Sequence, residues 1–153
     1  MDYIETYQKL FKLLKEHKYD EFIDIINEVD ISDIMFDINV RDKQDNYLLT
    51  HAVTLNQPNI VRLLIDHGAR IDIVDKYDRS VLIIPITYSF FEVMEILLEA
   101  NKNHIGISII DIRDKNMRNP LHYAIEVQNL PAIELLLKYG ANPNITDKDG
   151  MNS

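Results

Sequence analysis

The chain has 153 residues, of which 46% are hydrophobic, and a formal net charge of −9 from 16 basic and 25 acidic side chains. This length predicts about one domain, and the hydrophobic fraction is high enough for a sizeable core. Because phosphate-binding surfaces need clustered lysine and arginine, the charge argues against nucleic acid and membranes as partners. The absence of cysteine excludes disulfides, thiolate metal sites and cysteine nucleophiles.

The N-terminal sequence shows neither a secretory signal nor a membrane span. "MDYIETYQK" carries acidic side chains where a signal peptide carries positive charge before an apolar run. No apolar stretch reaches the roughly 18 residues that a spanning helix requires. We therefore expect an intracellular, cytoplasmic protein, which would act in the host cytoplasm if it is viral or an effector.

Two amphipathic helices are predicted within residues 3–29, joined by a turn at "HKYD". Apolar residues recur at helical spacing in both of them. They are Ile4, Tyr7, Leu10, Phe11 and Leu14 in the first helix, and Phe22, Ile23, Ile25, Ile26 and Val29 in the second. The polar outer face is predicted to consist of Lys9, Lys12, Lys15, Glu16 and Lys18.

One short motif then occurs four times along the chain. "DKQD" begins at Asp42, "DKYD" at Asp75, "DKNM" at Asp114 and "DKDG" at Asp147, at intervals of 33, 39 and 33 residues. A period in this range is typical of repeat architectures. Because these aspartates recur with the turn, we interpret them as bracing its backbone N–H groups.

Two helical patterns follow each of the first three motifs. In the third unit they are "PLHYAIEV" and "PAIELLLKYGAN", and "NIVRLLIDHGAR" and "EVMEILLEANKN" align with the second of these. Gly68 and Gly140 are predicted to end helices in a left-handed conformation, and Pro58 and Pro131 to lie near helix starts. The wide apolar faces predict helices that pack against neighbouring repeats.

The segment "NPLHYA", Asn119 to Ala124, resembles the T-P-L-H-x-A signature of the ankyrin repeat family, with asparagine in place of threonine. "GAR" at 68–70 and "GAN" at 140–142 resemble the family's ending of the second helix. The signature is weaker in the first unit, "YLLTHA", and weakest in the second, "SVLIIP". The resemblance implies an all-α, ankyrin-type helical repeat solenoid with a β-turn and two antiparallel helices per repeat.

The same resemblance implies a division of the chain. Residues 1–36 would form a diverged N-terminal capping helix pair, and residues 37–153 would hold the repeats, at 42–74, 75–113, 114–146 and a partial repeat at 147–153. The second repeat has a six-residue insertion, which we place at "HIGISII" (His104–Ile110) and expect to pack onto the repeats.

Two local irregularities carry further expectations. Pro85 falls inside the first helix of the second repeat, where it is expected to shorten or kink the helix at a cost of roughly 3 kcal/mol. The motif at Asp147 is interpreted as the start of a fourth unit whose helices are missing. We therefore expect an uncapped, apolar C-terminal repeat through which the chain self-associates.

No catalytic, cofactor-binding or metal-binding residue is predicted. The five histidines have no pair at the i, i+4 spacing of a helical zinc site, and no glycine-rich phosphate loop is present. No carboxylate pair departs from the repeat as an acid–base pair should, so we expect no enzymatic activity. The resemblance implies a structural role for His122, which would brace neighbouring turns, whereas His51 is displaced by one residue from the matching position.

Finally, the resemblance implies that a partner protein binds the projecting turn tips and the concave face of the first helices. The candidate tip residues are Lys43, Gln44, Asn46, Lys76, Tyr77, Arg79, Lys115, Asn116 and Arg118. The candidate concave residues are Thr54, Leu55, Thr87, Tyr88, Glu126 and Val127. Tyrosine and arginine often dominate binding energy, which singles out Tyr77, Tyr88 and Arg79.

The predicted function is a non-catalytic protein–protein interaction module. Two alternatives remain open at this point. The chain could be the targeting or substrate-recruiting segment of a longer enzyme or adaptor that continues past Ser153. It could also be a decayed array without a partner, which the weak signatures of the second unit favour.

Overall fold

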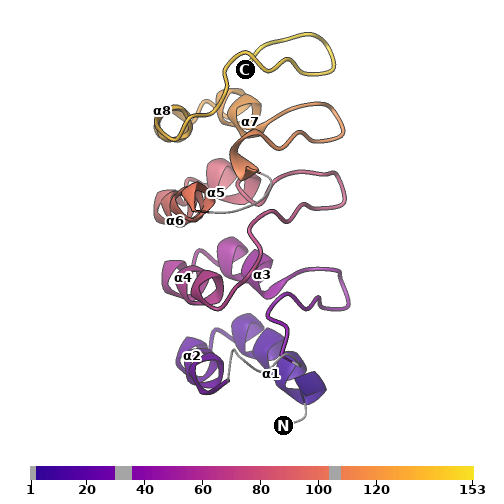
Figure 1. Ribbon diagram of the computed structural model, residues 1–153, viewed down its shortest axis with the longest axis vertical. Coiled ribbons are helices and arrows are strands. Elements are labelled where there is room, and N and C mark those ends of the chain that lie inside the picture. The colour runs from indigo at the N-terminus through magenta and orange to yellow at the C-terminus, as the bar shows by residue number, and fades with distance from the viewer. Residues whose placement is uncertain (1–2, 30–35, 104–107) are drawn as a thin grey trace. The chain divides into compact units, whose positions relative to one another are not determined.

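The computed structural model describes residues 3–29, 36–103 and 108–153, and it contains two compact units, Met1–Arg70 and Ile71–Ser153. Within the described residues the regular elements are helices, and the only β-pairing consists of isolated bridges in the turns (Figure 1). The prediction of an all-α helical repeat fold is confirmed.

The first unit contains two helix pairs. They are α1 (Tyr3–Lys15) with α2 (Tyr19–Glu28), and α3 (Leu48–Thr54) with α4 (Pro58–Asp66). Helix α1 contacts α3 and α2 contacts α4, so that the first helices form one layer and the second helices another (Figure 1). Leu10, Phe22, Leu49 and Leu64 are fully buried or nearly so.

The second unit contains two further pairs. They are α5 (Ile83–Tyr88) with α6 (Phe91–Lys102), and α7 (Pro120–Glu126) with α8 (Leu130–Lys138), with the short 3₁₀ helix η1 (Ile109–Asp111) between them in the chain. Ile109 and Ile110 are buried, and η1 contacts both α6 and α7. The described end of the predicted insertion therefore packs onto the repeats, while its residues 104–107 lie outside the described residues.

The turn between the two helices has one geometry in all four pairs. A left-handed residue is followed by a residue whose N–H donates to the carbonyl five positions earlier, at 2.9–3.0 Å, which is the Schellman arrangement. The left-handed residues are His17, Asn56, Ser89 and Gln128, with φ from 51° to 59°. This shared turn supports the interpretation of residues 1–36 as a diverged repeat.

Helix α5 shows how the second repeat accommodates Pro85. The helix has 6 residues, against 7 in both α3 and α7, so the expected shortening is confirmed. It begins at Ile83, however, and Pro85 is its third residue. The predicted position in the helix interior is therefore wrong, and the expected cost of roughly 3 kcal/mol does not arise, because N–H groups of a first turn have no intrahelical partner.

The second helices end as predicted where glycine is present. Gly68 and Gly140 have φ of 84° and 91°, and the next residue in each case donates its N–H to Leu64 or Leu136 at 2.9 and 3.0 Å. A side chain at either glycine would meet no atom within 4 Å, so the backbone conformation, and not the available space, favours glycine. In the second repeat Asn101 takes the corresponding position, and α6 continues to Lys102.

Candidate protein-binding surface

Each projecting turn, here called a tip, is organised by its recurring aspartate. One carboxylate oxygen of each aspartate accepts hydrogen bonds from two backbone N–H groups, two and four positions later, at 2.7–3.0 Å. The last residue of each motif is left-handed, namely Asp45, Asp78, Met117 and Gly150. The prediction that Asp42, Asp75, Asp114 and Asp147 brace their turns is confirmed.

The second carboxylate oxygen has a different partner in each of the first three repeats. His51 Nε2 donates to Asp42 at 2.8 Å, Arg79 Nε donates to Asp75 at 2.7 Å, and the Tyr123 hydroxyl donates to Asp114 at 2.5 Å. His51 and Tyr123 lie on α3 and α7, so in the first and third repeats the aspartate joins the tip to the first helix.

These contacts shift the pKa values of Asp42, Asp114 and Tyr123. Burial alone would raise the pKa of Asp42, but hydrogen bonds from Asn46, His51 and Gln44 outweigh it and lower the pKa to about 2. The pKa of Asp114 is lowered in the same way, against burial, by hydrogen bonds from Tyr123 and the tip amides. Burial and the bond to Asp114 raise the pKa of Tyr123 to about 12. Asp42 and Asp114 are therefore carboxylates at neutral pH, and Tyr123 is a neutral donor.

His122 has the structural role that the resemblance implied. It lies buried on α7, where its backbone N–H donates to the side chain of Asn119 at 3.1 Å. Its Nδ1 accepts from the backbone N–H of Asn119 at 3.3 Å, and the two bonds form a capping box. Its Nε2 lies 3.1 Å from the carbonyl oxygen of Met151, in the tip of the next motif. His122 thus joins a helix start to a neighbouring turn.

The tips of the second unit form one connected edge. The backbone N–H of Lys115 donates to the carbonyl of Tyr77 at 3.2 Å, and the N–H of Lys148 donates to the carbonyl of Asn116 at 2.9 Å. Tyr77 is 49% exposed, and the charged groups of Lys76 and Arg79 each lie 5.0 Å from the centre of its ring. The predicted tip residues of the second and third repeats are thus brought together.

The predicted concave residues are accessible, and they are divided between the first and the second unit. Thr54, Thr87, Glu126 and Val127 are exposed, Leu55 is half-buried, and Tyr88 is 66% exposed. Arg118 Nη1 donates to Glu126 at 2.6 Å, which joins the third tip to the end of α7. Tyr88 stacks on Phe90, with ring centres 5.7 Å apart. Lys43, Gln44, Asn46, Thr54 and Leu55 belong to the first unit, and the other candidate residues belong to the second.

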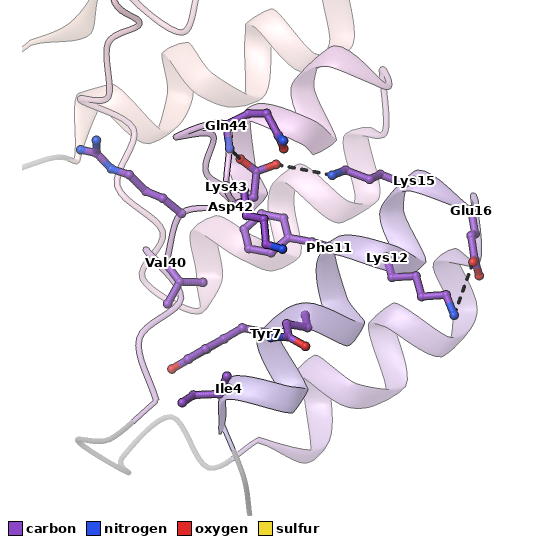
Figure 2. Close-up of a pocket in the computed structure, with 12 residues that line it drawn as sticks. Ile4, Tyr7, Phe11, Lys12, Lys15, Glu16, Val40, Asp42, Lys43 and Gln44 are labelled. Atoms are coloured by element: carbon purple, nitrogen blue, oxygen red, sulfur yellow. Dashed lines mark hydrogen bonds and ion pairs between the residues drawn. The ribbon is translucent and has the colours of Figure 1, made fainter.

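A groove of about 800 Å³ lies in the first unit between α1 and the first tip (Figure 2). The side chains of Ile4, Tyr7 and Phe11 extend from α1 toward the segment that carries Val40 and Asp42 (Figure 2). The groove is lined by Ile4, Tyr7, Gln8, Phe11, Lys12, Lys15, Glu16, Val40, Arg41, Asp42, Lys43 and Gln44.

Of the residues that line this groove, only Lys43 and Gln44 were among the binding residues predicted from the sequence. Ile4 was predicted in the buried stripe of α1 but is 68% exposed, and Lys12 and Lys15 were assigned to a plain solvated face. The difference in length between α1 and α3 is the signal that could have indicated this groove. Helix α1 has 13 residues and the facing α3 only 7, so α3 cannot cover the whole apolar stripe.

Across 3–29, 36–103 and 108–153, no group of three or more histidine, aspartate or glutamate side chains could hold a metal ion. Within the same ranges, no helix has both the length and the apolar character to cross a membrane.

Comparison with known proteins places these features in a family. The sequence model of ankyrin repeats in three copies matches residues 7–109, and that of ankyrin repeats in many copies matches residues 102–153. The chain belongs to the ankyrin repeat family. Ankyrin repeats are generally non-catalytic and typically mediate protein–protein interaction.

The curated relatives of this ankyrin repeat chain are longer proteins. It is 39% identical to a putative ankyrin repeat protein of Acanthamoeba polyphaga mimivirus, over 95% of the chain and 19% of that protein. It is 28% identical to a putative ankyrin repeat protein of fowlpox virus, over 97% of the chain and 33% of that protein. It is 32% identical to a putative E3 ubiquitin-protein ligase of Arabidopsis thaliana, over 67% of the chain and 26% of that protein. The chain thus spans a third or less of each of these relatives.

Proposed function

We propose that these ankyrin repeats are a non-catalytic module that holds another protein through its tips and the adjoining first helices. The observation that carries this proposal is the aspartate brace, which fixes the tip backbone while leaving most of the tip side chains exposed. A loop that is already ordered loses less conformational entropy on binding than a mobile one. Tyr77 and Arg79, stacked on each other at the connected edge of the second unit, offer side chains of the types that dominate interfaces.

Alanine substitution at the tips tests this proposal. We expect Tyr77→Ala combined with Tyr88→Ala to weaken capture of the partner by about thirtyfold or more, as loss of a binding centre should. Helicity measured by circular dichroism should not change, because both side chains are largely exposed. Arg79→Ala is made separately, since Arg79 also bonds Asp75 and its loss would loosen the tip.

The matched control is Phe91→Ala, which removes a partly exposed aromatic ring on α6. This control should capture the partner as well as the original chain does. Equal capture by the double tip variant and the control would contradict the proposal.

A second candidate is that the chain recruits substrates for a longer enzyme or adaptor. It is supported by the small share of each relative that the chain spans and by the relative named as a ubiquitin ligase. The reading frame after Ser153 distinguishes the candidates, because an enzymatic domain there would favour recruitment. A folded chain that captures no protein specifically would favour the decayed array.

We also propose that the chain acts inside cells, in the host cytoplasm if it is viral, because two of its relatives are viral. Self-association is proposed through exposed apolar side chains of α7 and α8, namely Ile125, Leu130 and Leu137. Light scattering over a concentration series should then show a rising average mass. A constant monomer mass would contradict self-association.

A further inference from the structure

We propose that the groove between α1 and the first tip binds a short acidic segment of the partner protein, with an apolar side chain at one end. This inference rests on the proposed function and names the chemistry of the partner. It is carried by the arrangement of the groove, which is apolar toward the start of α1 and basic toward its end (Figure 2).

The apolar end is built from Ile4, Tyr7, Phe11 and Val40. The Tyr7 hydroxyl accepts a hydrogen bond from the N–H of Asp37 at 2.7 Å, and its ring centre lies 5.4 Å from that of Phe36. The orientation of Tyr7 is therefore fixed before any ligand binds. Ile4 is far more exposed than an apolar side chain that completes a core, so burying it against a ligand is favourable.

The basic end is formed by Lys12, Lys15 and Lys43. Lys12 lies 3.7 Å from Glu16 and Lys15 lies 3.6 Å from Asp42, which are distances of loose ion pairs and not of hydrogen bonds. The Lys12 and Lys15 side chains are 70% and 52% exposed. Because each ammonium has three donors, both lysines retain hydrogen-bonding capacity for a carboxylate of a ligand.

The acidic side chains of the lining offset only part of this charge. Glu16 is shared between Lys12 and Lys18, and the Asp42 carboxylate also accepts hydrogen bonds from two backbone N–H groups and His51. Arg41 is balanced by Asp45, whose carboxylate oxygens both lie 2.8 Å from its Nη1. Lys43 is exposed, and within the described residues it has no ion pair.

The local charge is opposite to that of the whole chain. Apart from Arg41, which Asp45 balances, the lining residues include three basic and two acidic side chains, whereas the chain carries a net −9. A basic groove on an acidic protein attracts carboxylates locally, while the remaining surface repels extended polyanions. Nucleic acids and anionic membranes need a broader basic surface, so a short acidic peptide is the occupant that the charges favour.

The length of the groove determines how many positions should separate the acidic residue of the ligand from its apolar residue. Ile4 and Lys15 are separated by about 16 Å along α1, at a rise of about 1.5 Å per residue. An extended peptide spans this distance in about five residues, at about 3.3 Å each. The ligand should therefore carry its acidic residue about five positions from its apolar residue.

Selection from a bead-displayed library of random seven-residue peptides tests this inference on the full chain. We expect enrichment of peptides that combine aspartate or glutamate with leucine, isoleucine or phenylalanine at this spacing. The double variant Lys12→Glu and Lys15→Glu should bind the enriched peptides about tenfold more weakly, and high salt should weaken binding to the original chain. Lys12→Gln with Lys15→Gln should give a smaller loss in the same direction.

Lys9→Glu is the control variant, because Lys9 lies on the same helix, is exposed and does not line the groove. It should bind the enriched peptides within about twofold of the original chain. Absence of enrichment, enrichment of peptides without acidic residues, or equal losses in both variants would overturn the inference. Phosphatidylserine vesicles or an oligonucleotide whose binding depends on Lys12 and Lys15 would also overturn it, in favour of phosphate.

Two further readouts separate this inference from the proposed function. The double tip variant Tyr77→Ala and Tyr88→Ala should still bind the enriched peptides, because neither residue lines the groove. If the partner is captured normally by the Lys12→Glu and Lys15→Glu variant, the groove inference fails and the proposed function stands.

Discussion

Replacing Asn129 by alanine is expected to lower the free energy of unfolding by about 3 kcal/mol. Asn129 is buried and acts as the N-cap of α8, where its side-chain oxygen accepts a hydrogen bond from the N–H of Ala132 at 3.2 Å. Its amide nitrogen donates to the carbonyl of Ile86 at 2.8 Å and to the hydroxyl of Ser89 at 3.2 Å. The substitution therefore removes a cap and leaves a buried carbonyl of the preceding repeat without its donor.

Urea denaturation followed by circular dichroism measures this effect, with Gln57→Ala as the matched control. Gln57 holds the same position in the first repeat, but its side chain donates only to the carbonyl of Leu55, at 3.1 Å, and makes no cap. Its loss should cost less than about 1 kcal/mol. Asn129→Ser retains an oxygen that can cap α8 and should recover about 1 kcal/mol. Equal losses at Asn129 and Gln57 would show that Asn129 does not join the repeats.

The substitution Asp42→Asn is expected to lower the free energy of unfolding by about 2 kcal/mol at neutral pH. The pKa of Asp42 is about 2 in the folded chain, below the ordinary value of about 4 that it takes when unfolded. A depressed folded pKa contributes stability that is fully present above the unfolded value. That contribution is lost as the pH falls from about 4 through about 2.

The difference in unfolding free energy between the original chain and Asp42→Asn, measured against pH, isolates this group from the other aspartates. It should be constant near neutrality and shrink below about pH 4. Asp45→Asn is the matched control, because Asp45 lies in the same tip with an exposed side chain paired to Arg41. Exposed ion pairs contribute little, so this variant should unfold nearly as the original chain does. A difference for Asp42→Asn that does not vary with pH would contradict the role of the carboxylate.

The parts of the fold that recur along the chain could be predicted from the sequence. The aspartate at the start of each motif recurs at intervals of 33, 39 and 33 residues, and glycine recurs after α4 and α8; each has a direct backbone role. His122 could be assigned because the whole signature surrounds it. The partners of the second carboxylate oxygen could not be predicted from the sequence. His51, Arg79 and Tyr123 differ in type, and Arg79 lies four residues after its aspartate, whereas His51 and Tyr123 lie nine residues after theirs.

The groove on α1 was not predictable from periodicity alone. An apolar residue at helical spacing has the same pattern whether a core or a ligand covers it, so Ile4 and Leu10 look alike in the sequence. In the structure Leu10 is buried and Ile4 is exposed, and the facing α3 has 7 residues against 13 in α1. The prediction for Pro85 was wrong for a similar reason. Helix α5 begins at Ile83, so Pro85 lies in its first turn, where a missing N–H costs little, and not in its interior.

The aspartate braces are the feature on which the proposed binding surface depends, and amide hydrogen exchange tests them most directly. We expect the N–H groups of Gln44 and Asn46, which donate to Asp42, to exchange roughly tenfold or more slowly than that of Lys43. The N–H groups of Tyr77 and Arg79 should show the same protection relative to that of Lys76. Equal, fast exchange at all six of these positions would mean that the tips are mobile, and it would contradict a preformed surface.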